Sequence, residues 1–184
     1  IMAEIEAMKI NDLPKYEHLI MGKWLDKVEG QLLTNWCYGE FDNSLPFYYG
    51  LDFGFFPDPD VLVKVAIDNG KKKIYVKEVF RLNNASEQVL TDTVEKALNE
   101  YGRRQIIADS SGKRPINSIR AKGIQVIDCI KYAGSVEDGV RLLQSFEIIV
   151  SPESKEIGNE LNMYHQKNGV IISLYDHALD CIRY

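Results

Sequence analysis

Acidic residues interrupt apolar segments at three places in the chain, and these acids are the residues best suited to chemistry. Asp52 stands inside the apolar run YYGLDFGF, Asp109 ends the run QIIAD, and Asp180 lies within the stretch ALDCI. A buried carboxylate without a partner is costly, so each acid needs a cation or a hydrogen-bond donor. Carboxylate oxygens suit Mg²⁺ or Mn²⁺, and two such ions about 4 Å apart can hydrolyse a phosphodiester. The three acids therefore predict a two-metal site, in which Asp52 bridges both ions.

Some of these residues also have a structural explanation. Asp52 at the end of a strand could cap the following turn, and Asp176 suits the N-cap of the last predicted helix. His177 and Asp180 are three residues apart and so share a helix face, although a single histidine is more often structural than a ligand. Asp180 needs a partner because its helix is expected to pack on the sheet. The chemical interpretation therefore rests on the three acids as a set.

The composition is that of a soluble globular protein and excludes several classes of function. The chain has 184 residues with 45% hydrophobic content, which suits one domain with its own core. No apolar segment approaches the length of about eighteen residues that a membrane-spanning helix needs. Three cysteines without CxxC spacing and three scattered histidines indicate neither a disulfide framework nor a zinc site, and favour a reducing cytosol. The net charge of −5 argues against tight autonomous binding of nucleic acid, but not against carboxylates that hold cations.

The elements that must position the acids follow from the periodicity of apolar residues. Strands are predicted over 48–55, 61–68, 74–82, 105–110, 124–130 and 147–150. Helices are predicted over 86–102, 114–123, 135–146, 152–164 and 175–184, and in part of 1–30. Ser86 is expected to cap its helix, Gly102 to end it, and Pro152 to lie in a first helical turn. Hairpin turns are predicted at 69–73 and around Asn168-Gly169, and a loop over 31–47.

The order of these elements predicts an α/β fold. Three meandering strands come first, followed by alternating helices and strands, which indicates a mixed sheet, antiparallel on one side and parallel on the other, flanked by helices. Asp52 and Asp109 then lie at the carboxyl ends of core strands, the edge of such a sheet where ligands collect. The chain begins without Met at position 1 and stops at Tyr184 within a helical pattern, so we expect it to be a fragment.

Several segments resemble the C-terminal nuclease domain of the large terminase subunit of tailed bacteriophages. They are YYGLDFGF with the following PDPDVLV, IIADSSGKRPINSIRAKGIQV, and the closing DHALDCIRY. The last is similar to the family ending DH-x-x-D-A-x-R-Y, with Cys181 in place of the usual Ala. The resemblance extends from about residue 10 to the last residue, and the closing motif is its most specific part. It implies a ribonuclease H-like nuclease domain over 47–184, with 1–46 as a lead-in from an absent ATPase domain.

The resemblance also implies a site and a biological role. Asp52, Asp109 and Asp180 would bind Mg²⁺ or Mn²⁺, with His177 beside the second metal as ligand or partner of a ligand. The activity would be cleavage of double-stranded viral DNA concatemers at the start and end of genome packaging. The implied partners are the ATPase domain, the portal protein and the small terminase subunit, in the host bacterial cytoplasm and transiently at the procapsid portal. No G-x-x-x-x-G-K-[ST] motif occurs, so we expect no ATP hydrolysis by this chain.

One segment departs from the family pattern. Many relatives carry Ala-Glu-Pro-Lys after the second aspartate, whereas this chain has Ser111-Gly112-Lys113-Arg114, so an acidic neighbour is missing. Lys113 and Arg114 are instead candidate contacts to DNA phosphates, because they follow Asp109 closely. The lysines at 71–73 fit a solvated hairpin tip better than a DNA contact.

Other functions compete with this interpretation. The DFG sequence at 52–54 also occurs in protein kinases, but no Gly-rich loop, VAIK-type lysine or HRD motif precedes it here. Another ribonuclease H-like nuclease, such as a Holliday junction resolvase or a transposase-type enzyme, would use the same set of acids. A domain that binds DNA or the portal without cutting is a further alternative.

Overall fold

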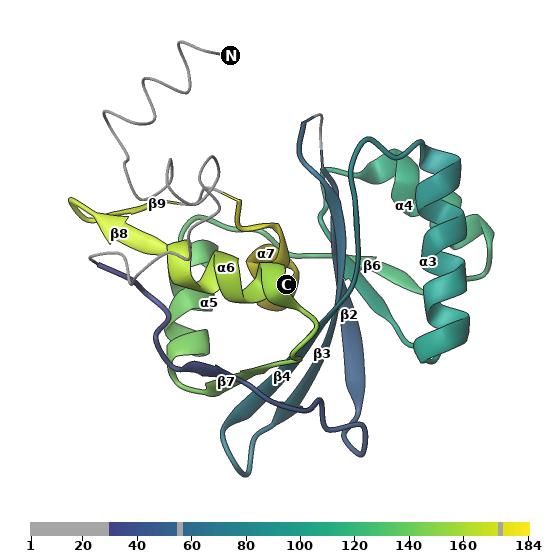
Figure 1. Cartoon of the computed structure of the whole chain (residues 1–184). Coiled ribbons are helices and arrows are strands. Elements are labelled where there is room, and N and C mark those ends of the chain that lie inside the picture. Colours follow the sequence, from purple (N-terminus) through teal and green to yellow (C-terminus); the bar gives the residue numbers. More distant parts are fainter. Residues whose placement is uncertain (1–29, 55–56, 173–174) are drawn as a thin grey trace.

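A mixed β-sheet separates two layers of helices (Figure 1). The computed structural model describes residues 30–54, 57–172 and 175–184, so the helices predicted within 1–30 lie outside the described residues. In the described part of the chain, the sheet has seven strands in the order β1-β7-β4-β3-β2-β5-β6. Helices α5, α6 and α7 cover one face of the sheet, and α3 and α4 cover the other (Figure 1). None of the described helices is long and apolar enough to cross a bilayer.

The antiparallel strands occupy the centre of the sheet rather than one side. The strands of the sheet are β1 (Trp36–Tyr38), β2 (Phe47–Asp52), β3 (Asp60–Asp68), β4 (Lys73–Leu82), β5 (Ile106–Ala108), β6 (Val126–Asp128) and β7 (Glu147–Val150). Strands β2, β3 and β4 pair antiparallel, as predicted. Parallel strands extend the sheet on both sides, since β5 pairs with β2 and β7 pairs with β4. The mixed sheet is therefore confirmed, but its predicted division into two halves is wrong, because α5 leads the chain back to the β4 side.

The first strand was not predicted, because 31–47 was expected to be a loop. Residues Trp36–Tyr38 form β1, which pairs in parallel with β7 at the edge of the sheet. No residue of this short strand is fully buried, so its sequence lacks the alternation that marks a strand. The strand exists because β7 offers it an open edge. The predicted boundary between a lead-in and a nuclease domain at residue 47 stays a prediction.

The helices follow the predicted order with adjusted ends. They are α3 (Glu87–Tyr101), α4 (Lys113–Ala121), α5 (Ser135–Gln144), α6 (Lys155–Met163) and α7 (His177–Arg183). Ser86 caps α3 by accepting a hydrogen bond from the Val89 amide at 3.3 Å, and Gly102 ends the helix with φ 105°, both as predicted. Pro152 precedes α6 instead of lying in its first turn, because that helix begins at Lys155. The predicted hairpin at Asn168-Gly169 is confirmed as β8 (His165–Lys167) and β9 (Val170–Ile172).

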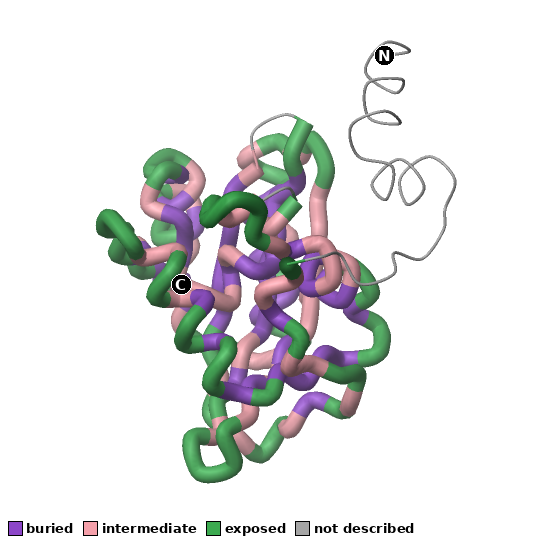
Figure 2. The backbone as a smooth tube through the Cα atoms, turned by 90° about the vertical axis from the view of Figure 1, so that its left-hand side faces the viewer, coloured by how far each residue is buried: buried purple, intermediate pink, exposed green. Residues whose placement is uncertain are grey.

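Alternate residues of β2 point into different layers, and this alternation positions the predicted site. Tyr49 and Leu51 pack in the apolar core beneath α3 and α4. Gly50 faces α7 so closely that a Cβ atom there would lie 2.0 Å from the carbonyl oxygen of Cys181. Asp52, two residues further along the strand, therefore also faces α7. Burial is concentrated in the sheet and the inner faces of the helices, and the exposed residues gather in loops (Figure 2).

Candidate functional site

Asp52 joins the centre of the sheet to the last helix. It is the final residue of β2 and is only 7% exposed. Its Oδ2 atom lies 3.0 Å from Nδ1 of His177, and its Oδ1 accepts a hydrogen bond from the Tyr184 hydroxyl at 2.8 Å. Both oxygens of this carboxylate are therefore held by residues of the closing segment, 125 or more positions later in the chain.

Asp180 belongs to the same network. Its Oδ1 is paired with the Arg183 guanidinium, and its Oδ2 lies 3.5 Å from the Tyr184 hydroxyl. The Tyr184 hydroxyl thus stands between the carboxylates of Asp52 and Asp180. Tyr184 is a site residue that could not be predicted from periodicity or spacing, since its only signal in the sequence is its place in the closing motif.

Asp109 lies at the edge of this network and reaches it through a lysine. It directly follows β5, and its Oδ1 lies 2.7 Å from Nζ of Lys131. Ser111 donates its backbone amide to Oδ1 of the same carboxylate at 3.0 Å and its hydroxyl to Oδ2 at 2.9 Å. The Lys131 ammonium is also 5.4 Å from the centre of the Tyr184 ring. Sequence reasoning missed Lys131, because a single lysine in a loop after β6 carries no pattern.

The electrostatics of the cluster differ from one acid to the next. Burial raises the pKa of Asp180 to about 6, and the nearby Asp176 carboxylate adds to this rise, against the opposing effect of Arg183. Burial also acts to raise the pKa of Asp109, but hydrogen bonds from Lys131 and Ser111 lower it overall. At Asp180, burial and the Asp176 carboxylate thus outweigh Arg183, whereas at Asp109 the bonds from Lys131 and Ser111 outweigh burial.

The same surroundings favour the protonated form of His177. The hydrogen bond to Asp52 raises the pKa of His177, although burial acts in the opposite direction. Its Nε2 atom lies 3.8 Å from Asp58. The imidazole is therefore placed between two acids, which is the environment of a cationic partner or of a metal ligand.

The donor chemistry of the cluster fits a divalent cation, although the acids do not converge on one point. In the ranges that the structure describes, no three acidic, histidine or cysteine side chains are grouped closely enough to hold a metal ion. The reason is that different partners hold the acids, namely Lys131 for Asp109 and Arg183 for Asp180. Carboxylate oxygens with one imidazole are nevertheless ligands that hard divalent cations accept. The structure thus brings Asp52, Asp180 and His177 into one network and leaves Asp109 beside it, and their role as metal ligands stays a prediction.

The predicted N-cap residue of the last helix is confirmed, but the side chain that holds the first amides of the helix belongs to another residue. Asp176 occupies the N-cap position of α7 but makes no capping hydrogen bond with its side chain. Glu160 of α6 instead accepts hydrogen bonds from the amides of Ala178 and Leu179, at 2.9 and 3.0 Å. The capping role predicted for the Asp176 side chain is therefore wrong, because a carboxylate from a neighbouring helix already receives these amides. Sequence reasoning missed Glu160, since nothing in α6 distinguishes it from the other acids there.

The loop after Asp109 borders a pocket of about 490 Å³. Lys113 and Arg114 line it together with Phe53 and Gly112. Each of the two cations is paired with an acid, Lys113 with Asp128 and Arg114 with Glu87. A Cβ atom at Gly112 would lie 2.1 Å from the Phe53 ring, so any side chain at this position would require Phe53 to move.

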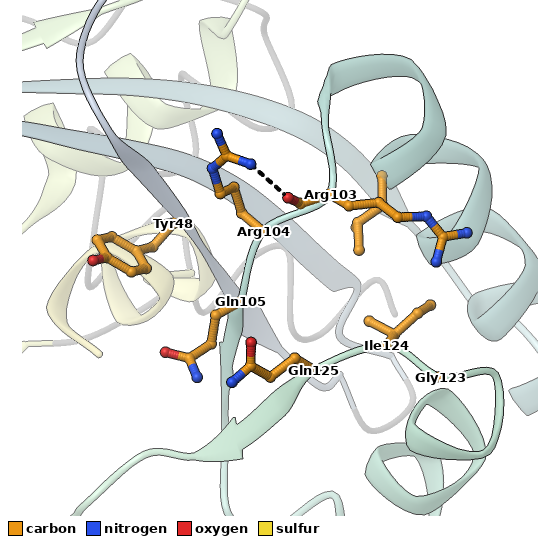
Figure 3. A pocket seen from close by; sticks show the side chains of 8 residues that line it. Tyr48, Arg103, Arg104, Gln105, Gly123, Ile124 and Gln125 are labelled. Carbon is orange, nitrogen blue, oxygen red and sulfur yellow. Dashed lines mark hydrogen bonds between the residues drawn. The ribbon is translucent and has the colours of Figure 1, made fainter.

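A second pocket, of about 430 Å³, contains none of the predicted acids (Figure 3). Its lining includes Arg103, Arg104 and Gln105, which precede β5, and Gln125, which precedes β6 (Figure 3). It therefore lies at the start of these two parallel strands, whereas Asp109 follows the end of β5. The predicted chemistry is confined to the other edge of the sheet.

Comparison with known families adds an independent observation. The sequence model of the family described as "Terminase RNAseH like domain" matches residues 52–184, which is well over half of the chain. The chain belongs to the terminase RNase H-like domain family. The matched segment begins at Asp52 and ends at Tyr184, so it contains every residue of the network around α7. The resemblance noted in the sequence is thereby confirmed.

Curated terminase large subunits are similar to this terminase domain along much of its length. The large subunit of the terminase of Bacillus phage SPP1 is 30% identical over 201 aligned positions, which cover 98% of this chain and 46% of the relative. The PBSX phage terminase large subunit of Bacillus subtilis is 27% identical over 148 positions, covering 75% of this chain and 33% of the relative. The chain thus spans less than half of the length of these relatives.

Solved structures of terminase domains share the fold. The nuclease domain of the large terminase of bacteriophage SPP1, crystallised with bound Mn, superposes with a TM-score of 0.69 at 29% identity, over 82% of this chain and 94% of that domain. The large terminase nuclease of thermophilic phage G20c, crystallised with bound cobalt, reaches a TM-score of 0.61 at 16% identity, over 85% of this chain and 96% of that one. The predicted ribonuclease H-like fold of the terminase domain is therefore confirmed.

Proposed function

We propose that this chain is the DNA-cutting domain of a viral genome-packaging enzyme. It would act as a divalent-metal-dependent endonuclease that cleaves double-stranded DNA concatemers when packaging starts and when it ends. The observation that carries the proposal is the network in which Asp52 contacts His177 and shares the Tyr184 hydroxyl with Asp180. The nuclease domain of the SPP1 large terminase, which is similar over 82% of this chain, was crystallised with bound Mn, and this supports a metal at the same acids.

In the proposed mechanism, the acids in and beside this network bind the metal. Asp52, Asp109, Asp180 and His177 would hold Mg²⁺ or Mn²⁺. When bound, two such ions supply an activated water and stabilise the charge on the leaving oxygen. The chain's own contribution is to keep the Asp52 carboxylate oriented, because Tyr184 holds one of its oxygens and His177 the other.

Basic residues near the acids would receive the DNA. The Lys131 ammonium, beside Asp109, places positive charge where the scissile phosphate has to approach the acids. Lys113 and Arg114 are proposed to contact phosphates further along the backbone, next to the pocket that contains Phe53. Since the whole chain carries a net charge of −5, we propose that other parts of the packaging enzyme supply much of the affinity for DNA.

The partners and the location follow from the same proposal. The ATPase domain that accompanies the cutting domain in large terminase subunits would lie outside this chain, so no ATP hydrolysis is expected from it. The portal protein and the small terminase subunit would bring the domain to the DNA. Cutting would take place in the host bacterial cytoplasm, at the portal of the procapsid.

Relaxation of a supercoiled plasmid tests the proposal. The wild-type chain is incubated with Mn²⁺ or Mg²⁺ beside Asp52→Asn and Asp180→Asn, and the rate of nicking is measured. Each variant should lose at least about a hundredfold in rate, because it removes a charged oxygen that would bind metal. The matched control is Asp92→Asn, which changes an exposed acid on α3 that pairs with Lys122, far from the network.

Several outcomes would contradict the proposal in different ways. Asp52→Asn and Asp180→Asn variants that nick as fast as Asp92→Asn would show that these acids hold no catalytic metal. A wild-type chain that binds the plasmid but cuts with neither metal would favour a binding domain. A preference for branched over linear duplex DNA would favour a resolvase.

A further inference from the structure

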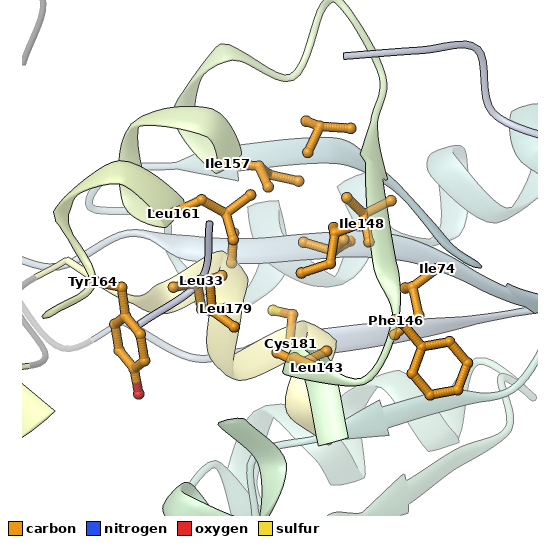
Figure 4. Packing of buried hydrophobic residues seen from close by; sticks show 14 of the residues in the cluster. Leu33, Ile74, Leu143, Phe146, Ile148, Ile157, Leu161, Tyr164, Leu179 and Cys181 are labelled. Carbon is orange, nitrogen blue, oxygen red and sulfur yellow. The ribbon is translucent and has the colours of Figure 1, made fainter. Parts of the chain in front are cut away.

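Glu160 is a buried acid outside the proposed metal-binding set. Its side chain is 5% exposed, on the face of α6 that packs against the sheet. Ile157 and Leu161 of its own helix and Leu179 of α7 belong to the apolar core on this face of the sheet (Figure 4). An ionised carboxylate in such surroundings is stable only when hydrogen bonds or cations satisfy both of its oxygens. The hydrogen-bond partners of Glu160 therefore indicate its structural role.

One oxygen of Glu160 holds the beginning of α7. Oε2 accepts hydrogen bonds from the Ala178 amide at 2.9 Å and from the Leu179 amide at 3.0 Å. The first amides of a helix have no partners within the helix, and a negative charge beside them is favoured by the helix dipole. Since Asp176 does not cap this helix with its side chain, the acid of α6 takes over the task.

The other oxygen of Glu160 is anchored to the sheet. Oε1 lies 2.7 Å from Nη2 of Arg81, on β4. The same guanidinium contacts Oε2 of Glu78 through its Nε and Nη2, at 3.1 and 2.8 Å. The Glu78 amide in turn donates to the Ser154 hydroxyl, just before α6. A chain of hydrogen bonds thus runs from β4 through α6 to the first turn of α7.

The two amides held by Glu160 lie between the two residues that α7 contributes to the site. Ala178 and Leu179 are the only residues that separate His177 from Asp180. Because the backbone here is helical, a displacement of this turn moves both side chains together relative to Asp52. Arg81 restrains the Glu160 carboxylate from the opposite side, so the position of the turn is set by the sheet and not by α7 alone.

We propose that Glu160 is a positioning residue, which with Arg81 fixes the first turn of α7 so that His177 and Asp180 can bind metal with Asp52. This inference rests on the proposed function. A residue that supports metal ligands without touching the metal typically changes metal affinity by about 10- to 100-fold when it is altered. A residue that only stabilises the fold would change the stability and leave the affinity of the folded protein unchanged.

The test compares Glu160→Gln with Glu156→Gln, an exposed acid on the same helix whose carboxylate accepts a hydrogen bond from the Asn159 side chain at 3.4 Å. Three properties of the full chain are measured: amide hydrogen exchange at 178 and 179, Mn²⁺ binding followed by electron paramagnetic resonance, and plasmid nicking. Glu160→Gln should speed exchange of both amides and weaken Mn²⁺ binding at least about tenfold. Nicking should fall most at low Mn²⁺ and recover in part as Mn²⁺ is raised, whereas Glu156→Gln should match the wild type.

Arg81→Lys provides a second variant in case Glu160→Gln does not fold. It keeps a positive charge near Oε1 but loses the two-pronged contact with Glu78, so Mn²⁺ binding should weaken by a few-fold while the amides at 178 and 179 stay protected. The inference is wrong if Glu160→Gln, or failing that Arg81→Lys, binds Mn²⁺ as tightly as Glu156→Gln. A wild-type chain that binds no Mn²⁺ would overturn both this inference and the proposed function. If the wild type binds Mn²⁺ and nicks the plasmid, and Glu160→Gln does both equally well, only the inference about Glu160 is overturned.

Discussion

The two faces of the sheet are both well packed, but they bury different kinds of residues. Beneath α3 and α4 the described core consists of apolar side chains such as Leu98 and Ile116. Beneath α5, α6 and α7 lies a similar apolar core (Figure 4). This face also carries the ion pairs Arg81–Glu160 and Arg183–Asp180, in which each of the four side chains is less than one quarter exposed. The first face can be explained by burial of apolar surface alone. The second face also holds buried charges, and we infer that these charges position the proposed site.

The largest expected effect compares a matched leucine on each face. Leu98 on α3 and Leu161 on α6 are 2% and 0% exposed. Replacing either with alanine should lower the free energy of unfolding by about 2–5 kcal/mol, because each leaves a cavity in a dense core. Nicking by the folded protein should be unaffected by Leu98→Ala and reduced by Leu161→Ala, which loosens the helix that carries Glu160. Urea denaturation measures the stability, and plasmid nicking at low Mn²⁺ measures the activity. Equal nicking by the two variants would show that the two faces do not differ in their effect on the site.

A smaller effect is expected at the closest contact between β2 and α7. Gly50→Ala should cost about 1–3 kcal/mol of unfolding free energy, because its Cβ meets the Cys181 backbone, which cannot move without shifting α7. Nicking should fall by about a hundredfold, as misplacement by about 1 Å does in other active sites. The control is Leu51→Val, the next residue on β2, which points into the opposite layer. A Gly50→Ala variant with normal nicking would show that the seating of α7 on β2 does not matter.

The smallest effect is expected at Lys64, a buried charged residue on the face of the sheet that α3 and α4 cover. Lys64 is 4% exposed, packs over the rings of Phe41 and Phe47, and donates to Asn43. Burial lowers the pKa of Lys64 in the folded protein, so the unfolded chain holds this proton more tightly. The free energy of unfolding of the wild type therefore increases as the pH rises toward about 10.4, the ordinary pKa of lysine. Lys64→Met should therefore stabilise the protein by about 1 kcal/mol at pH 7, and this gain should shrink near pH 10.5.

Urea denaturation at the two pH values measures the gain, with Lys155→Met as the control. Lys155 also lies over an aromatic ring, that of Tyr38, but it is exposed at the surface. A loss of stability at pH 7 for Lys64→Met would show that the ring contacts and the Asn43 bond outweigh burial. In that case a buried charge would stabilise the protein on the face beneath α3 and α4 as well as on the face beneath α5, α6 and α7.

Features with a local signal could be predicted from the sequence. Asp52 was identified because an acid in an apolar run is conspicuous, and the cap at Ser86 because its residue type and position agree. The antiparallel strands and the five described helices follow from periodicity in the same way.

Features that depend on distant partners could not be predicted. β1 becomes a strand only because β7 lies beside it, and Glu160 is buried only because α7 packs over it. Lys131 and Tyr184 likewise gain their contacts from loops and helices that are far apart in the sequence. The family resemblance supplied His177 as a candidate, but no resemblance pointed to the residues that hold α7 in place.

The seating of α7 has a consequence for the order in which the domain can mature. The bond from Asp52 to His177 joins residues 125 positions apart, and α7 is the last of the described elements to leave a ribosome. A nascent chain that has already formed β2, β3 and β4 still lacks the His177, Asp180 and Tyr184 contacts to Asp52. Contacts between residues so far apart cost more loop-closure entropy than the local pairing of β2, β3 and β4, so we expect them to form after it. Under the proposed function, a copy whose α7 is not yet seated on β2 would therefore not cut DNA, because His177, Asp180 and Tyr184 would not yet be in place beside Asp52.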